Sequence, residues 1–278
     1  MALAAATAIS IGAAAPVAAH PERAGDPDRI VARTAAADPA TITICLQPLG
    51  KHDRKLLAPL ARGITEVYGF TVTTLAAREL PAEAWYEPRK RWRADKLLDE
   101  LAADVVPDSG CQAVVGVTSD DISVAKIDHA RRQQDGTHEI DWGIFGLAYL
   151  DSQVAVISSH RLSRGKARRG KVARRLVKVA IHELGHTFGL DHREGEVNAT
   201  CTMNDAGGTI RTVDAELGTI CADERDHIER HLGVTLPVVT APDWTFVETG
   251  KRKATKTKAA KATKATKAAA GGEEAKAP

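Results

Sequence analysis

Two hydrophobic periodicities alternate along the middle of this chain, between residues 41 and 236. Runs of β-branched and apolar residues predict strands at 41–46, 71–75, 113–118 and 154–159. Apolar residues at helical spacing predict helices at 51–68, 95–105, 171–190 and 216–232. The run at 113–118 is almost wholly apolar, which is typical of a strand buried on both faces. The pattern therefore predicts an α/β fold, in which helices back a mixed, twisted sheet within one compact domain.

The segments on either side of this domain differ from it in composition. Residues 1–19 are small or apolar and carry no side-chain charge, and Val-Ala-Ala at 17–19 fits the small-residue rule for leader cleavage. We expect a signal peptide at 1–19, a polar linker at 20–40, the folded domain at 41–236 and an extension at 237–278. The product is then secreted or periplasmic. Because a positively charged n-region is missing, an alanine-rich tail or a true start further upstream is the alternative.

The net charge of the chain is only +2, but it is unevenly distributed. Residues 251–278 hold eight lysines, one arginine and two glutamates, a net charge of +7, so the preceding residues carry −5. This tail repeats Lys, Ala and Thr without large apolar residues, and we expect it to be disordered. It could contact anionic polymers or surfaces, or act only as a solubilising segment. It has no aromatic residue for base stacking, which argues against a specific nucleic-acid partner. No stretch of the chain is suited to span a membrane.

The strongest chemical motif is HExxHxxGxxH at residues 182–192, on the predicted helix at 171–190. Residues four apart lie on one helix face, so His182 and His186 can present two imidazoles to one point. Gly189 can adopt the positive φ that ends the helix and returns the chain, which could bring His192 to the same point. Three nitrogen ligands leave the fourth tetrahedral position of a zinc ion open, as in catalytic sites. Glu183, beside that point, is a candidate general base for a water molecule.

The extended motif resembles that of the metzincins, which also place a methionine turn beneath the metal. Met203, in the Cys-Thr-Met segment at 201–203, follows at a suitable distance for that turn. The residues at 46–50, 89–101, 114–122, 145–148 and 154–162 further resemble the archaemetzincins, over roughly residues 41–234. The resemblance implies a metzincin-like fold with an active-site helix, one catalytic zinc ion, and hydrolysis of peptides or proteins. It also implies that the strand holding Val154, Val156 and Ser158 is the sheet edge beside the cleft, where an extended substrate would pair.

The cysteines depart from the archaemetzincin pattern, in which four of them bind a second, structural zinc ion. Two of those four positions are Arg193 and Glu224, and only Cys201 and Cys221 remain. Two thiolates cannot fill a tetrahedral site without further ligands, so we expect the structural zinc to be absent. A Cys201–Cys221 disulfide would close a loop of about 20 residues and stabilise the fold by roughly 3 kcal/mol. This exchange requires an oxidising compartment.

Cys45 and Cys111 are the other two cysteines, and each lies in or beside a hydrophobic strand. If they pair, their loop of about 66 residues contributes roughly 4 kcal/mol. Two buried, unpaired thiols are the alternative. Four cysteines permit three connectivities, and the sequence does not choose among them.

These features predict a monomeric zinc peptidase that uses Glu183 as its general base. The alternative is a zinc-binding pseudoenzyme or scaffold whose basic tail contacts anionic surfaces. A pseudoenzyme typically loses the glutamate or a ligand histidine, and this chain retains all four residues.

Overall fold

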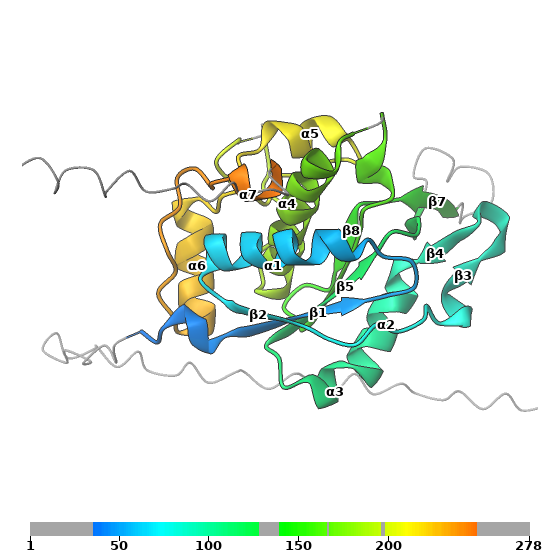
Figure 1. Cartoon of the computed structure of the whole chain (residues 1–278), viewed down its shortest axis with the longest axis horizontal. Coiled ribbons are helices and arrows are strands. Elements are labelled where there is room, and N and C mark those ends of the chain that lie inside the picture. Colours follow the sequence, from blue (N-terminus) through cyan, green and yellow to red (C-terminus); the bar gives the residue numbers. More distant parts are fainter. Residues whose placement is uncertain (1–35, 128–138, 166, 196–197, 249–278) are drawn as a thin grey trace, which may run out of the picture. The chain divides into compact units, whose positions relative to one another are not determined.

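The computed structural model describes residues 36–127, 139–165, 167–195 and 198–248 (Figure 1). The predicted signal peptide at 1–19, most of the linker predicted at 20–40 and the basic tail at 251–278 lie outside these residues. No helix in the described part of the chain has both the length and the apolar character that a membrane span requires.

Five strands form the main sheet, in the order β2-β1-β5-β9-β8 (Figure 1). Their bounds are β1 Thr43–Pro48, β2 Thr71–Thr74, β5 Ala113–Thr118, β8 Gly146–Ala148 and β9 Val154–Ser158. In this sheet β2, β1, β5 and β9 are parallel, and β8 is antiparallel to β9. Every residue of β5 and β9 is buried, as their apolar sequences require. The predicted mixed sheet is confirmed.

The edge of this sheet is β8, so the prediction that the strand at 154–159 forms the edge is wrong. β9 lies between β5 and β8, and its Val154, Val156 and Ser158 are buried. The three residues of β8 are only partly buried, and Leu147 pairs with Val156. A continuously apolar strand belongs in the interior of a sheet, whereas a very short strand with half-exposed side chains suits an edge.

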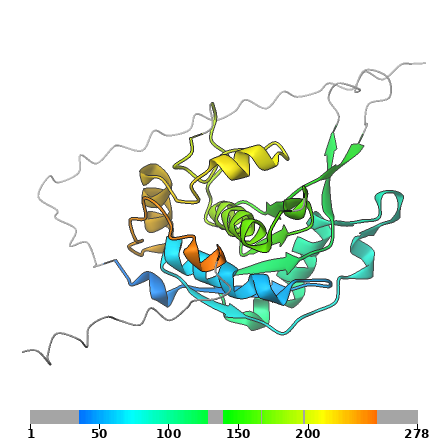
Figure 2. The same ribbon diagram turned by 45° about the horizontal axis from the view of Figure 1, so that its top comes forward.

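Helices cover both faces of the main sheet (Figures 1 and 2). α1 (Arg54–Tyr68) and α4 (Arg169–Thr187) pack on one face, in a core that includes Ile44 of β1. α2 (Ala94–Asp104) packs on the other face, in a core that includes Cys45. Successive strand residues point to opposite faces, so neighbouring residues of β1 serve the two different cores.

Capping residues set where the helices begin and end. Asp53 accepts a hydrogen bond from the N–H of Lys55, so α1 begins at Arg54, three residues after the predicted start. The helix predicted at 216–232 begins only at Ala222, as α6 (Ala222–Leu232), because Gly218 has a φ of +82° and Cys221 is the N-cap. The shorter helices are α3 Val106–Ser109, α5 Ile210–Ala215, α7 Thr245–Glu248 and the 3-10 turns Pro39–Thr41, Ala82–Ala84, Glu87–Arg89 and Arg161–Ser163.

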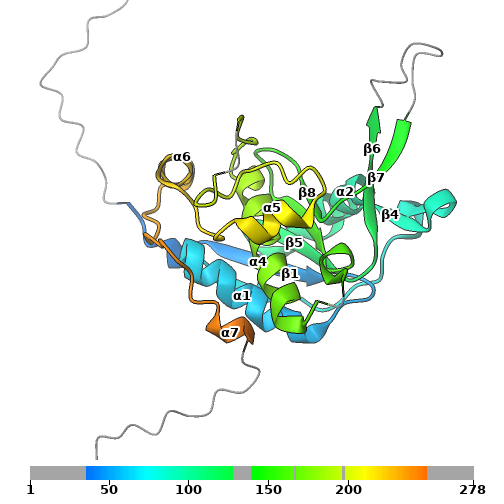
Figure 3. The ribbon, with the colours of Figure 1, turned by 90° about the horizontal axis from the view of Figure 1, so that it is seen from above.

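A second, four-stranded sheet has the order β3-β4-β6-β7. Its strands are β3 Trp85–Tyr86, β4 Arg91–Arg93, β6 Ile122–Ile127 and β7 Glu139–Gly143. The antiparallel strands β6 and β7 project beyond the main sheet (Figure 3). Arg91 ties this sheet together through ion pairs of 2.9 Å to Asp121 and 2.8 Å to Asp141. The hairpin therefore has a fixed base beside the end of β8.

Both candidate cysteine pairs form disulfides, so the alternative of two unpaired thiols at Cys45 and Cys111 does not hold. Cys45–Cys111 joins β1 to the residues before β5, with the two Cα atoms 5.9 Å apart. Cys201–Cys221 joins the segment around Met203 to the start of α6, with a Cα separation of 4.7 Å. Packing also continues past residue 236, because Val247 of α7 is buried in the same core as α4.

The contact between α1 and α4 yields a stability prediction. Gly63 of α1 faces Val177 of α4 so closely that an added Cβ would overlap the Val177 side chain. Alanine normally stabilises a helix interior over glycine by about 1 kcal/mol. Here we expect Gly63→Ala to destabilise the protein by about 1–3 kcal/mol, through overpacking. Urea unfolding of Gly63→Ala, Val177→Ala and the double variant measures this. A neutral or stabilising Gly63→Ala, or additive single effects, contradicts the prediction.

The ion pairs of Asp214 lead to a prediction of how the stability of the fold depends on pH. Arg175, whose side chain is 6% exposed, donates two hydrogen bonds of 2.7 Å to this carboxylate, and Lys171 adds an ion pair of 3.1 Å. The bonds from Arg175 lower the pKa of Asp214 to about 2. A depressed carboxylate pKa stabilises the fold above the unfolded-state pKa of about 3.9, and this contribution is lost as the pH falls towards 2. In urea unfolding of the metal-free protein, the stability difference between wild type and Asp214→Asn should shrink between pH 4 and pH 2. A constant difference contradicts this.

Candidate metal centre

Three imidazoles converge at the C-terminal end of α4. The Nε2 atom of His186 lies 3.1 Å from that of His182 and 3.2 Å from that of His192, and the Nε2 atoms of His182 and His192 are 3.2 Å apart. These atoms form one potential metal-binding group. A tetrahedral zinc ion with Zn–N distances of about 2.0–2.1 Å separates its ligands by about 3.3 Å. The three nitrogens therefore fit zinc.

Gly189 lies at the turn that follows α4 and returns the chain towards the two histidines of the helix. α4 ends at Thr187, and Gly189 follows with a φ of +84°, in the left-handed region. The N–H of Leu190 then donates to the carbonyl of Gly185, which caps the helix end. The chain turns back here, and His192 meets the two histidines of the helix.

Backbone carbonyls fix which ring nitrogens face one another. Nδ1 of His182 lies 2.7 Å from the carbonyl oxygen of Thr202, and Nδ1 of His186 lies 2.7 Å from that of Leu190. A carbonyl only accepts hydrogen bonds, so each Nδ1 carries the proton and each Nε2 keeps its lone pair. Burial lowers the pKa of His182 to about 3 and also lowers that of His186. Neutral rings with converging lone pairs are suited to bind a cation.

Glu183 lies beside the histidines and is buried, with 6% of its surface exposed. Burial raises the pKa of this carboxyl group to about 8. Gly146 of the edge strand packs directly on it: an added Cβ would lie 2.5 Å from Oε1 and 2.7 Å from Cγ. Gly146 lies in one of the segments that resemble the archaemetzincins, but no role in the site is predicted for it. In the sequence it is only a glycine within a short apolar run. The reason for a glycine here is clear only from the structure, in which β8 packs on Glu183 of α4.

Met203 packs against α4 between the two histidines of the helix. It is 1% exposed, and its sulfur packs so closely on Gly185 that a Cβ there would overlap it. Gly185, between the two histidines of the helix, therefore lets the methionine turn approach α4. The sequence motif predicts no role for this glycine.

A cleft of about 340 Å³ opens in front of the histidines. β8 forms one wall, the β6–β7 hairpin contributes Trp142, and the loop after Met203 contributes Asp205. The other residues that line the cleft are Val124, Lys126, Ile144, Phe145, Leu150, Asp191, Ala206, Gly207 and Gly208. The lining is largely apolar around a polar centre, which is typical of a site for an organic substrate.

Comparison with known proteins places the chain among the metallopeptidases. Residues 108–193 match the model of the Reprolysin-like metallopeptidase family M12B. The archaemetzincin of Methanocaldococcus jannaschii is 30% identical over 171 residues, which cover 60% of this chain and 82% of that protein. The chain belongs to the archaemetzincin family. The archaemetzincin of Haloquadratum walsbyi is 29% identical over 181 residues, covering 63% of this chain and 92% of that protein. As a member of this family, the chain is a zinc metallopeptidase and acts on peptides or proteins.

Solved archaemetzincin structures share the fold. The archaemetzincin of Methanopyrus kandleri matches with a TM-score of 0.55 and 24% identity, over 69% of this chain and 95% of that one. The archaemetzincin of Archaeoglobus fulgidus, solved with malonate, matches with a TM-score of 0.52 and 23% identity, over 67% of this chain and 99% of that one. The metzincin-like fold expected from the sequence is therefore confirmed.

Proposed function

We propose that this archaemetzincin cleaves peptide bonds at the three-histidine centre, with His182, His186 and His192 as the zinc ligands. The observation that carries the proposal is the convergence of three Nε2 atoms beside the buried Glu183, within a cleft. A zinc ion held by these histidines would supply a Lewis acid that polarises the scissile carbonyl and lowers the pKa of a water molecule towards about 7.

Glu183 is the proposed general base. It accepts a proton from the attacking water and delivers a proton to the nitrogen of the leaving amine. A group that both takes and returns a proton works best when its pKa is near the working pH. Burial raises the pKa of Glu183 in the metal-free protein, and the positive charge of a zinc ion bound beside it would lower that pKa again, towards the working pH.

The substrate backbone is proposed to pair with the free side of β8, in place of the strand at 154–159. β9 occupies one side of β8, and Gly146, Leu147 and Ala148 line the cleft. An extended peptide can add to such an edge through main-chain hydrogen bonds, while side-chain pockets set the preference. Gly146 would then bring the paired peptide next to the carboxylate of Glu183.

We also propose that the protein holds one zinc ion and is exported. A disulfide already joins Cys201 and Cys221, so their sulfur atoms are not thiolate ligands. Arg193, at another of the family's cysteine positions, donates to Asp223 at 2.5 Å, which places a positive charge beside any metal site there. Two disulfides support an oxidising compartment, either extracellular or periplasmic.

Metal content and cleavage, measured on wild type and Glu183→Ala, test the function. We expect one zinc ion per chain in both proteins, and cleavage of a peptide library reduced by on the order of 10²–10⁴-fold in the variant. Equal cleavage by both proteins would contradict the role of Glu183 as general base. Two zinc ions per chain contradict the disulfide interpretation. One zinc ion without cleavage by wild type favours the alternative, a zinc-binding protein without turnover.

Gly146→Ala tests the contact between the edge strand and the base. The added methyl group would displace the Glu183 carboxylate, and misplacement of a catalytic group by about 1 Å can cost on the order of 10²-fold in rate. We expect such a loss in kcat/KM, with the zinc content unchanged. In a Glu183→Ala background, the same substitution should have little further effect. Wild-type activity in Gly146→Ala, or a full additional loss in the double variant, counts against the contact.

A further inference from the structure

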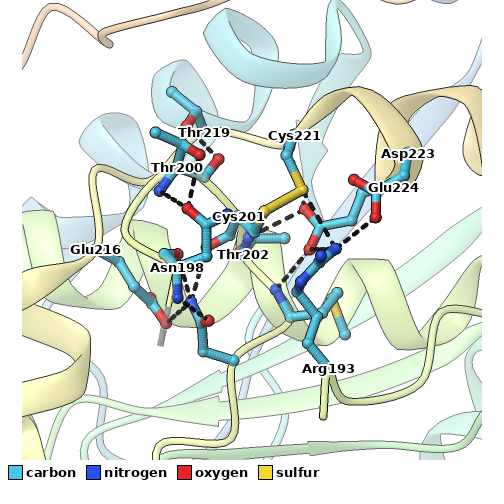
Figure 4. Close-up of a disulfide and its surroundings, with 12 residues drawn as sticks. Arg193, Asn198, Thr200, Cys201, Thr202, Glu216, Thr219, Cys221, Asp223 and Glu224 are labelled. Carbon is cyan, nitrogen blue, oxygen red and sulfur yellow. Dashed lines mark hydrogen bonds and ion pairs between the residues drawn. A yellow bond between two sulfur atoms is a disulfide. The ribbon is translucent and has the colours of Figure 1, made fainter. Parts of the chain in front are cut away.

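The carboxylate of Glu224 accepts hydrogen bonds from three backbone amides, two in the segment around Met203 and one at the start of α6. It is the third residue of α6 and is 3% exposed. One oxygen, Oε2, accepts from the N–H of Thr202 at 3.0 Å and from that of Cys221 at 3.2 Å. The other, Oε1, accepts from the N–H of Met203 at 3.1 Å. Figure 4 shows this carboxylate between the Cys201–Cys221 disulfide and Arg193.

One of these amides belongs to the peptide group that orients a histidine of the metal centre. The peptide bond between Thr202 and Met203 has its N–H on Glu224 and its carbonyl oxygen on Nδ1 of His182, at 2.7 Å. Hydrogen bonds in series polarise one another, so an ionised carboxylate on the N–H makes the carbonyl a stronger acceptor. A stronger acceptor holds the Nδ1 proton of His182 in place and raises the basicity of Nε2.

We propose that Glu224 is a positioning residue for the zinc centre and acts on His182 through the Thr202–Met203 peptide group. The inference rests on the proposed role of His182 as a zinc ligand. Carboxylates that bond directly to a ligand histidine are common in zinc sites. Here one peptide group stands between the carboxylate and the imidazole.

Arg193 connects the same turn to a second histidine. Arg193 directly follows His192 in the chain, and its backbone N–H donates to the carbonyl of Met203 at 2.8 Å. Its guanidinium lies 3.9 Å from Oε1 of Glu224 and donates to Asp223. The two peptide groups of Met203 therefore contact the segments of His182 and His192, and Glu224 anchors the first of them.

Zinc affinity of Glu224→Gln tests the proposal. Glutamine keeps the volume, but its NH₂ group cannot accept from the amides on that side, so at least one of the three hydrogen bonds is lost. Competition with a chromophoric chelator should give a zinc Kd that is 10–100-fold higher than that of wild type. The measurement is made at a temperature where circular dichroism shows the metal-free variant to be folded. The ¹⁵N and ¹H signals of the His182 Nδ1–H should also shift, which a general loss of stability would not cause.

Two control variants test whether a change in zinc affinity comes from the position of Glu224, or only from the loss of a nearby negative charge or from altered packing of a buried carboxylate. Asp223→Asn removes a carboxylate from the neighbouring position of α6, where Asp223 is bound to Arg193 and no amide of Met203. Glu216→Gln alters a buried carboxylate that contacts Asn204, the next residue of the turn, at 3.1 Å. Both should keep the zinc Kd within about twofold of wild type. A Kd for Glu224→Gln that is also within twofold, or an equal rise in all three variants, overturns the proposal.

A wild-type measurement covers the case in which Glu224→Gln does not fold. The amide proton of Met203 should exchange with solvent far more slowly than in an unstructured peptide, because the buried Glu224 holds it. Fast exchange at that amide overturns the proposal. If wild type itself binds no zinc, the proposed metal centre fails. If wild type binds zinc and Glu224→Gln binds it equally well, only the role of Glu224 fails.

Discussion

The structure of the centre depends on three imidazole nitrogens lying within 3.2 Å of one another. Lone pairs that face one another repel, so this arrangement suits a cation held between the rings, and a ring can bind that cation only through an unprotonated Nε2. The carbonyls of Thr202 and Leu190 meet this requirement by holding the Nδ1 protons of His182 and His186. One of these carbonyls comes from the turn that ends α4, and the other comes from a loop about twenty residues away. The metal centre is therefore only as well ordered as the loop that carries Thr202.

Two glycines of α4 and β8 allow the other elements to approach this helix. Because Gly185 has no side chain, the sulfur of Met203 can pack directly on α4. In the same way, Gly146 leaves room for the carboxylate of Glu183 against β8. In both places a methyl group would occupy space that the centre needs. Glu183 is buried where this packing occurs, and desolvation raises the pKa of its carboxyl group. The same close packing therefore positions the Glu183 carboxylate beside the three histidines.

Much of the centre could be predicted from the sequence because its chemistry is local. The spacing of His182, His186 and Gly189 encodes a helix face and its end within eight residues. The edge strand could not be found in this way. β8 has three residues, too few for a period-2 pattern, and its place is set by pairing with β9 rather than by its own composition. Contacts such as Gly146 with Glu183 join distant segments, and no local pattern records them.

The region that corresponds to the family's cysteine cluster is held together by a disulfide and by a buried carboxylate. Cys201 and Cys221 are cross-linked, and the neighbouring positions carry opposite charges, Arg193 and Glu224, 3.9 Å apart. A buried carboxylate is costly unless hydrogen bonds and a nearby cation compensate for its burial, and Glu224 has three amides and Arg193. A thiolate cluster would attach the loop through its sulfur atoms alone. The Glu224 carboxylate instead accepts a hydrogen bond from the peptide group that contacts His182. It therefore links the loop to the histidine centre more directly than a cross-link between sulfur atoms does.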